Sequence, residues 1–493
     1  MSTFHSWTPT LLYLLSTATL GPLLFGYHLA ELNEPQAVIT CAAKQSATTS
    51  LVTLPQCLPM TPLEFGLVSS FFTLGGLVGA LCGGPVTIFA AIGPVFEALA
   101  TNIAVFVVGR TIAGLGAGAA TVIVPIYISE ISPPGQKGFF GSFTQVSINF
   151  GILITQVLGL FLSKGQLWRI ILGVGGGIAA LQFAGLLLGG AESPKWLAEH
   201  GRAGQAKRVL RRMRGHEADI DEEVEGWGLD TSDDVEDEEE ELLAGHDEAP
   251  SSSSRQDNNN SSATKDTAHD LKQLGKSLGF LHVLQDPHTR PAVLAVAMIM
   301  VAQQLCGINS IVMYGVSLLS DLLEANAALL NVAVGVLNVV VTISAAPLVD
   351  KLGRKPCLLI SITGMGINSI LLAIGIMKAI PVLSCVAVLL FVASFGLGLG
   401  PVPFLLSSEL VAAEAVGATQ SWALASNWIA TFVVAQFFPL VNEKLGKGQV
   451  YFIFAGFAVL AGTLTWFFVP ETAGKRDADE VWGRTKNGGR RED

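Results

Sequence analysis

The chain has 493 residues, of which 50% are hydrophobic and only 14% are charged. This composition excludes an ordinary soluble protein, because runs of about 20 apolar residues are typical of helices that cross a membrane. The net charge of −11 arises in residues 217–248, which hold 17 Asp and Glu and no Lys or Arg. Elsewhere, 23 Asp and Glu stand against 29 Lys and Arg, which leaves +6.

Twelve apolar segments follow one another, six before and six after a polar insert at residues 191–290. They cover residues 9–30, 64–85, 86–101, 103–128, 139–162, 167–190, 292–319, 327–349, 356–377, 382–406, 416–440 and 450–469. This pattern predicts an all-α membrane protein with twelve transmembrane helices. We expect six-helix bundles at residues 1–190 and 291–475 and a tail at 476–493. Since no basic region precedes the first segment, it predicts a spanning helix rather than a signal peptide.

Basic residues predict the orientation. Lys195, Arg202 and Arg214 follow the sixth segment, and Lys351 and Arg354 follow the eighth. Because loops on the cytoplasmic side are rich in Lys and Arg, we expect the insert and both termini in the cytoplasm.

The insert has two predicted parts. Residues 194–214 favour short amphipathic helices with basic faces, and residues 216–270 are acidic and then Ser/Asn-rich, which predicts disorder. The run EEEELL at Glu238–Leu243 has the spacing of an acidic dileucine signal for trafficking adaptors. The simpler interpretation, a solvated acidic run that ends in two leucines, is favoured.

Six cysteines are scattered along the chain. Cys41 and Cys57 share one polar loop, so a disulfide between them and two free thiols are equally compatible with the sequence. No cysteine spacing predicts a metal site, and we expect no cofactor and no nucleic-acid partner.

The two halves repeat each other. Glu130, Gly138 and Glu192 recur 279 residues later as Glu409, Gly417 and Glu471. Matching residues at the ends of matching segments predict two similar bundles, as in the major facilitator architecture.

The repeat also reveals a gap. Residues 350–355 read DKLGRK, but the matching position in the first half falls inside the second apolar segment. Roughly 15 residues are therefore missing near Gly83–Val86, and the third helix would span only ~22 Å of a ~30 Å membrane core. A natural deletion, a splice variant and an error in the gene model each explain this gap.

The seventh segment contains polar residues near its middle, in the run QQLCGIN at residues 303–309. A buried amide without a partner costs roughly 2–7 kcal/mol, so these side chains must be hydrogen-bonded. On an ideal helix Asn309 lies about 240° round from Gln303. Both can face one site only if the helix breaks, and Gly307 is the expected place.

Five runs together resemble the sugar porter family of the major facilitator superfamily, which includes facilitative glucose transporters and proton–sugar symporters. They are residues 109–138 (GRTIAGLGAGAATVIVPIYISEISPPGQKG), 192–197 (ESPKWL), 303–309, 350–355 and 470–475 (PETAGK). The resemblance implies that a set of residues binds sugar hydroxyls or packs against the sugar ring. These are Gln145, Gln303, Gln304, Asn309, Asn338, Phe404 and Trp428. Amides suit this task because each hydroxyl is both donor and acceptor. The alternative is that they only hold helices together.

The resemblance also implies a charge network that gates the cytoplasmic side. Its members here are Glu130, Lys137, Glu192, Asp350, Arg354, Lys355, Glu409 and Glu471. Since Val416 stands where the family usually has arginine, and the first-half partner of DKLGRK is missing, we expect a weakened gate or an inactive protein.

Coupling would depend on His28 and Arg110. Symporters of this family carry aspartate at the position of His28, near an arginine that matches Arg110, whereas uniporters usually carry asparagine. Histidine fits neither pattern, although it titrates in a useful range. We favour facilitated diffusion, with proton-coupled symport as the alternative.

The sequence thus predicts transport of a hexose-class monosaccharide by alternating access, in the plasma or vacuolar membrane. A sugar sensor that does not transport is the competing hypothesis. An enzyme is not expected, because no nucleophile–base pair is evident.

Overall fold

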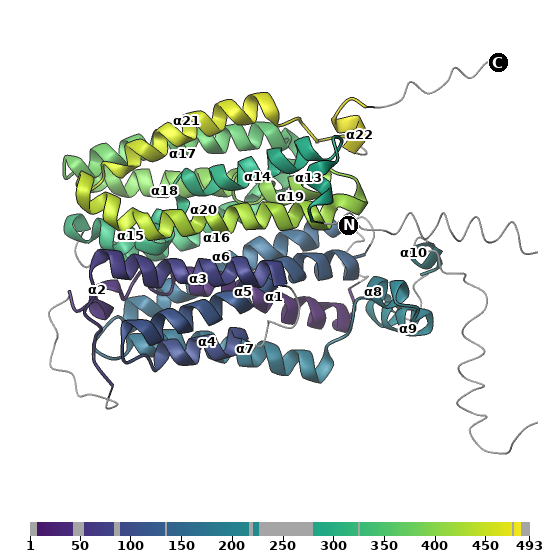
Figure 1. The fold of residues 1–493 in the computed structure, drawn as a ribbon, viewed down its shortest axis with the longest axis horizontal. Helices are drawn as coiled ribbons and strands as arrows, with labels where there is room; N and C mark the ends of the chain where they lie inside the picture. Colours follow the sequence, from purple (N-terminus) through teal and green to yellow (C-terminus); the bar gives the residue numbers. More distant parts are fainter. Residues whose placement is uncertain are drawn as a thin grey trace, which may run out of the picture.

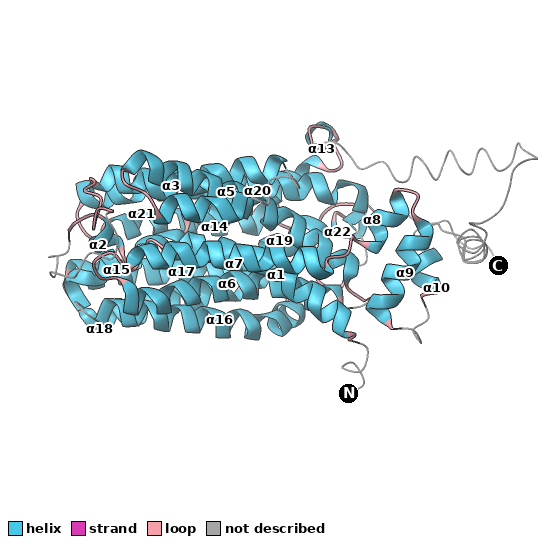
Figure 2. Cartoon of the chain, turned by 90° about the horizontal axis from the view of Figure 1, so that it is seen from below, coloured by secondary structure: helices cyan, strands magenta, loops and turns pink. Residues whose placement is uncertain are grey.

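The structure is a computed structural model that describes residues 7–42, 54–82, 89–133, 136–215, 220–225, 280–323, 326–475 and 478–484. Its regular elements in these ranges are all helices (Figure 2). Eleven of these helices are long and apolar enough to cross a membrane. A shorter twelfth helix, α4, corresponds to the third apolar segment.

The first half of the chain forms one group of helices, coloured purple to blue in Figure 1. Its members are α1 (Pro9–Ala30), α3 (Pro62–Cys82), α4 (Phe89–Ala98), α5 (Ile103–Ile131), α6 (Lys137–Leu162) and α7 (Trp168–Gly189). Side chains fix some of the helix starts, because Thr8 accepts a hydrogen bond from the Leu11 amide and Asn102 from the Val105 amide. These bonds satisfy amide groups that have no partner within the helix.

The second half forms the other group, coloured green to yellow in Figure 1. Its members are α14 (Arg290–Leu305), α15 (Ile308–Leu323), α16 (Asn326–Leu352), α17 (Arg354–Met377), α18 (Pro381–Leu397), α19 (Val402–Glu409), α20 (Val416–Leu445) and α21 (Val450–Phe468). The seventh predicted segment is divided between α14 and α15, and the tenth between α18 and α19. The predicted twelve-helix fold is therefore confirmed.

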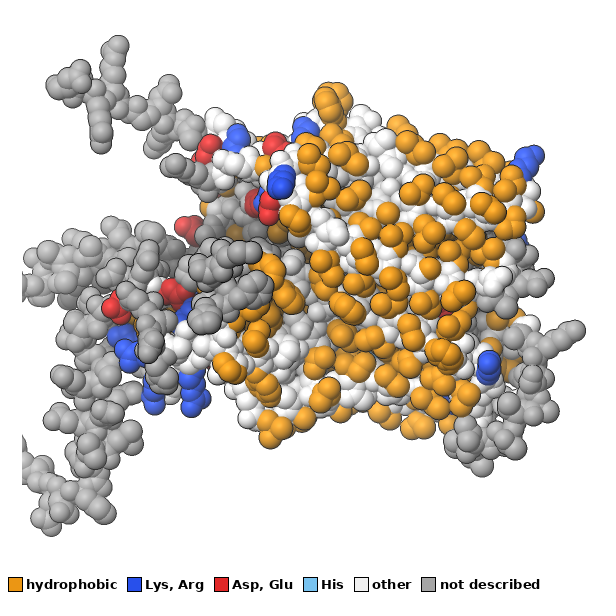
Figure 3. Space-filling model, turned by 180° about the vertical axis from the view of Figure 1, so that it is seen from behind, with side chains coloured by type: hydrophobic (Ala, Val, Ile, Leu, Met, Phe, Trp, Pro, Cys, Tyr) orange, Lys and Arg blue, Asp and Glu red, His pale blue; other side chains and the backbone are white. Residues whose placement is uncertain are grey.

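The surface is that of a membrane protein. On the face in Figure 3, hydrophobic side chains cover the middle of the molecule, and Lys and Arg lie toward its two ends. Leu188, Val382 and Phe467 are among the most exposed apolar side chains, at 87%, 73% and 75%. Such exposure is favourable only in contact with lipid.

The two halves meet along two pairs of helices, α3 with α20 and α6 with α16. At the first pair Gly66 and Gly76 of α3 allow close approach, since a Cβ on Gly76 would lie 2.4 Å from the Trp428 ring. A site between the halves is therefore framed by these four helices.

Helix α4 is short. Its ten residues extend about 15 Å, half of a ~30 Å membrane core. Residues 83–88 before it lie outside the described ranges, so the predicted shortening of the third helix stays a prediction.

The ends of the molecule differ. One end, here called the disulfide end, carries α2 (Gln36–Ile39) and the Cys41–Cys57 disulfide. The opposite end, here called the insert end, carries α8 (Pro194–Glu199), α9 (Ala203–Arg214), α13 (His282–Gln285) and α22 (Ala478–Val481) (Figure 1).

The expectation of disorder over 216–270 is wrong for residues 220–225, where α10 (Asp221–Glu225) forms. Ile220 and Val224 pack on Leu210 of α9, and Glu223 pairs with Arg214 at 3.1 Å. These apolar and ionic contacts stabilise α10 despite its acidic composition. The run Glu238–Leu243 lies outside the described residues.

Candidate functional site

The break in the seventh spanning helix brings three predicted residues together. It falls at Gly307, as expected, where φ is +96° and a Cβ would lie 2.4 Å from the Phe454 ring. Across the break, Asn309 donates to Gln304 at 2.6 Å and Gln304 donates to Gln303 at 3.0 Å. An unbroken helix would point Gln303 and Asn309 in different directions.

Helix α20 adds an amide that the sequence analysis missed. Asn427 Nδ2 donates to Gln303 Oε1 at 2.6 Å. In the sequence, this residue could have been noticed as an asparagine next to a tryptophan within a predicted spanning helix. Gln303, Gln304, Asn309 and Asn427 are called cluster A below.

Trp428 follows Asn427 and contacts the other half of the molecule. Its ring centroid lies 5.3 Å from that of Phe25 and 6.1 Å from that of Phe72. The indole Nε1 is buried and donates to no described residue. Trp428 therefore offers an aromatic face and a free donor at the interface between the halves.

A second polar cluster lies between α6 and α16. Asn149 accepts hydrogen bonds from Asn338 at 3.1 Å and Gln145 at 3.4 Å, and donates to Thr342 at 2.8 Å. These four residues are called cluster B. Sequence reasoning found Gln145 and Asn338 but missed Asn149 and Thr342.

The predicted sugar-binding residues thus fall into two groups. Within the described part of the chain, no hydrogen bond joins cluster A to cluster B, and the amides of both are satisfied mainly by one another. Phe404 on α19 is partly buried against the core and belongs to neither cluster.

The predicted coupling pair lies in a larger buried charge cluster. His28 Nδ1 lies 3.0 Å from Glu31 Oε1, and Arg110 donates to the same carboxylate and to the His28 carbonyl. A second carboxylate, Glu97 of α4, lies 3.9 Å from Arg110 Nη1. All four side chains are essentially inaccessible. One fixed positive charge therefore faces two carboxylates.

Sequence reasoning did not assign roles to Glu31 and Glu97. Both are acidic residues within or beside apolar runs, a placement that could have indicated a functional site in the membrane. Glu31 lies one turn after His28, so the carboxylate comes from a different position of the same helix.

At the disulfide end, polar side chains tie the two halves together. Asn33 donates to the Val312 carbonyl at 2.8 Å and accepts from the Val316 amide at 3.0 Å. Asn331 donates to Glu34 at 2.8 Å, and Ser70 donates to Gln436 at 2.7 Å. Among the described residues, no hydrogen bond joins the halves at the insert end. The structure is therefore closed at the disulfide end.

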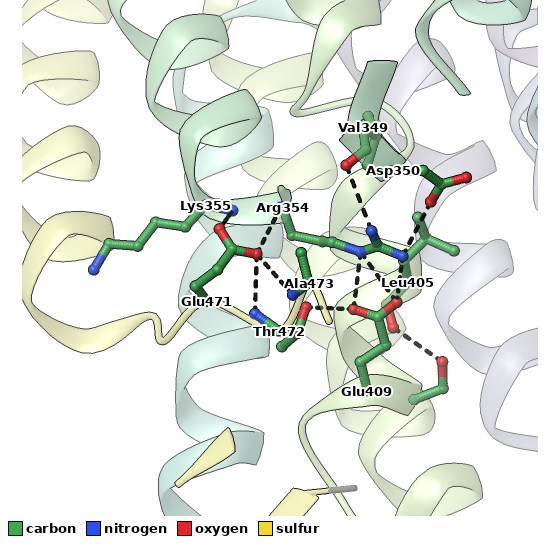
Figure 4. Close-up of polar contacts among 10 residues, drawn as sticks. Val349, Asp350, Arg354, Lys355, Leu405, Glu409, Glu471, Thr472 and Ala473 are labelled. Carbon is green, nitrogen blue, oxygen red and sulfur yellow. Dashed lines mark hydrogen bonds and ion pairs between the residues drawn. The ribbon is translucent and has the colours of Figure 1, made fainter. Parts of the chain in front are cut away.

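The second-half gating residues form a network within their own half (Figure 4). Arg354 pairs with Glu409 at 2.9 Å and with Asp350 at 3.2 Å. Glu471 accepts from the backbone amides of Arg354 and Lys355 at 2.9 and 3.0 Å. This network holds the ends of α16, α17, α19 and α21 together.

The first-half gating residues are arranged differently. Glu130 is half-buried and Glu192 is exposed, and neither has an ion pair with a described residue. The structure does not describe the side chain of Lys137. Instead, Arg214 of α9 donates to the carbonyls of Ile131 and Ser132 at 2.7 and 3.0 Å. A residue of the insert thus satisfies the end of α5.

Gly353 is required by the second-half network. Its φ is +96°, and a Cβ would lie 2.7 Å from the Glu471 carboxylate. We expect Gly353→Ala to lower the free energy of unfolding by about 1–3 kcal/mol, which is measured as a fall in thermal midpoint. Gly417→Ala is the control, since its Cβ would meet nothing within 4 Å. Equal midpoints for the two variants would contradict the assignment.

The raised pKa of Glu34 predicts that closure of the disulfide end depends on pH. Burial raises the pKa of Glu34 to about 7, against a smaller lowering by its hydrogen bond from Asn331. Opening exposes the carboxyl and returns its pKa toward the usual value of 4.5. Protonation therefore stabilises the closed state, fully below pH 4.5, and this stabilisation is lost as the pH rises through 7.

We expect labelling of a Ser70→Cys variant from the disulfide end to increase as the pH rises from 5 to 8, when its rate is divided at each pH by the rate for the same variant unfolded in denaturant. This ratio removes the ordinary gain in thiol reactivity with pH. Glu34→Gln should remove the dependence of the ratio on pH, because glutamine does not titrate. Glu64→Gln, at the same end and bonded to Thr61, should retain it. A ratio that still follows pH in the Glu34→Gln variant would exclude Glu34 as the responsible group.

The chain is similar to known proteins over most of its length. Residues 14–478 match the family model described as sugar (and other) transporter. The chain is 32% identical to a probable metabolite transport protein of Saccharomyces cerevisiae, with 94% of this chain and 93% of that protein covered. It is 29% identical to the facilitated glucose transporter member 3 of solute carrier family 2 from Ovis aries, with 95% and 91% covered.

Among solved structures, the xylose transporter XylE from E. coli, in a partially occluded inward-open conformation, superposes with a TM-score of 0.69. The identity is 24%, and 94% of this chain and 99% of that chain are covered. At this identity, the similarity shows a shared fold.

Proposed function

Because this chain belongs to the sugar transporter family, we propose that it carries a hexose-class monosaccharide across a membrane by alternating access. The observation that carries this proposal is the pair of amide clusters at the interface between the halves. Cluster A offers Gln303, Gln304 and Asn309, and cluster B offers Gln145 and Asn338.

The chemistry of these groups suits a sugar. An amide donates and accepts, so it can exchange its partner in the protein for a hydroxyl without leaving a buried charge. Trp428 packs against the apolar face of the ring, and its free Nε1 donates to a ring substituent. In the closed, empty state the amides bond to one another, which lowers the cost of their burial.

Alternating access is supported by a difference between the two ends: among the described residues, hydrogen bonds join the halves at the disulfide end and not at the insert end. Asn33, Glu34 and Ser70 hold the disulfide end closed, so rocking to the other state breaks the four hydrogen bonds described above, each with a net contribution of about 0.5–1.5 kcal/mol. This is small enough for sugar binding to shift the balance. The Arg354–Glu409 pair keeps the second half rigid as it moves.

We place the insert end and both termini in the cytoplasm, because α9 carries a basic face next to the bilayer. Its exposed residues include Arg208, Arg211 and Arg212. The membrane is the plasma membrane or that of the vacuole.

Uptake of radiolabelled hexoses in cells that lack their own hexose carriers tests the proposal. Saturable uptake supports it. Saturable binding by the purified protein without any flux would instead make this chain a sugar sensor, and the absence of both would exclude a sugar site.

Proton-coupled symport is a second candidate, favoured by the buried charge cluster. If Glu31 and Glu97 were both ionised beside Arg110 and a neutral His28, the buried site would carry one excess negative charge. Burial of uncompensated charge is costly, so the closed state favours one added proton. Sugar transport would then move a proton along with the substrate.

Proton coupling predicts that hexose addition makes the medium around vesicles more alkaline and that an uncoupler reduces accumulation. Glu97→Gln should abolish both effects while leaving exchange of labelled for unlabelled sugar intact. Hexose flux without proton movement in the unmodified protein would establish facilitated diffusion.

A further inference from the structure

Asn149 connects two predicted sugar-binding residues from opposite halves. It lies one turn after Gln145 on α6, so the two side chains share a helix face. Its Oδ1 accepts from Gln145 of the first half and from Asn338 of the second, at 3.4 and 3.1 Å. With 1% of its surface exposed, it is among the most buried amides in the protein.

Cluster B keeps one unmet acceptor. Asn338 is 5% exposed, and its Oδ1 accepts no hydrogen bond from a described residue. An orphaned buried acceptor costs about 1–3 kcal/mol, so a donor that reaches this oxygen between the halves stabilises the site. A ligand hydroxyl can donate to this oxygen.

We propose that Asn149 is a specificity-determining residue of the sugar site, where it binds one hydroxyl of a monosaccharide together with Asn338. In the empty state Asn149 holds the amides of Gln145 and Asn338 between the halves. When sugar binds, one hydroxyl accepts from Asn149 Nδ2 and donates to Asn338 Oδ1. A sugar without that hydroxyl leaves Asn338 Oδ1 without a donor and removes one acceptor from Asn149 Nδ2. This inference rests on the proposed function.

The test compares the KM of the best-transported hexose with the KM values of its monodeoxy analogues. Reconstituted protein without changes is expected to discriminate against one analogue by about tenfold or more. In Asn149→Val this ratio falls to about one, while the ratios for the other positions are unchanged. The KM for the parent sugar rises about tenfold, with kcat changed less.

Asn368→Val is the matched control, since it removes a buried amide whose described side-chain hydrogen bond stays within its own helix. It should preserve the discrimination. If Asn149→Val does not reach the membrane, Asn149→Ser is used in its place. The serine side chain is too short to reach the sugar hydroxyl, so the KM ratio is again expected to fall to about one.

The outcomes separate the two claims. A raised KM with unchanged discrimination among deoxy analogues shows that Asn149 is purely structural and overturns this inference alone. Neither flux nor binding of any hexose in the unmodified protein overturns the proposed function.

Discussion

Arg110→Ala is expected to produce a protein that neither transports nor folds to normal levels. Arg110 is the only cation of the described residues in contact with Glu31 and Glu97, and all three side chains are inaccessible to solvent. Its removal leaves uncompensated buried carboxylates, which costs about 3–5 kcal/mol. The whole free energy of unfolding of a typical protein is only about 5–15 kcal/mol.

The measurement is the yield of monodisperse protein and its thermal midpoint. Arg211→Ala, which removes an exposed arginine of α9, is the control and should behave as the unmodified chain. The combination Arg110→Ala, Glu31→Gln and Glu97→Gln carries no charge at the site and should recover the yield. A stable Arg110→Ala variant with both carboxylates intact would refute the charge balance described here.

Gly76→Val is expected to reduce turnover about tenfold or more. A Cβ at this position would lie 2.4 Å from the Trp428 ring, and that ring is itself held against Phe25 and Phe72. The valine side chain displaces the indole, so the first and second halves no longer approach as closely along α3 and α20. Overpacking of this kind costs about 1–3 kcal/mol, and 1.4 kcal/mol corresponds to a factor of about ten in population.

Two measurements separate this effect from misfolding. Gly177→Ala, whose Cβ would meet nothing within 4 Å, should transport normally. Ser70→Cys, buried between the halves, should react with an impermeant thiol reagent faster when combined with Gly76→Val. Unchanged labelling and turnover would mean that the halves need not approach at Gly76.

Much of the fold could be predicted because membrane-spanning helices depend on local composition. The segments 9–30, 103–128 and 416–440 became α1, α5 and α20 with small shifts of their ends. The break at Gly307 followed from the geometry of Gln303 and Asn309 on one helix.

The contacts within the site could not be predicted in the same way, because they depend on how distant helices rotate against each other. Asn149 meets Asn338 only because α6 packs on α16, and Asn427 meets Gln303 only because α20 packs on α14. Glu31 and Glu97 were visible as acidic residues, but their shared partner Arg110 emerged from the packing of α1, α4 and α5.

The central claim is that amides of clusters A and B bind one sugar between the two halves. The most direct measurement is hexose affinity and counterflow for Gln145→Ala, Gln303→Ala and their combination in liposomes. Asn368→Ala removes a buried amide that bonds only within its own helix and serves as the control. The account predicts about tenfold weaker binding for each single variant, no counterflow for the combination and normal counterflow for the control. Full affinity and counterflow in a well-folded combined variant would contradict it.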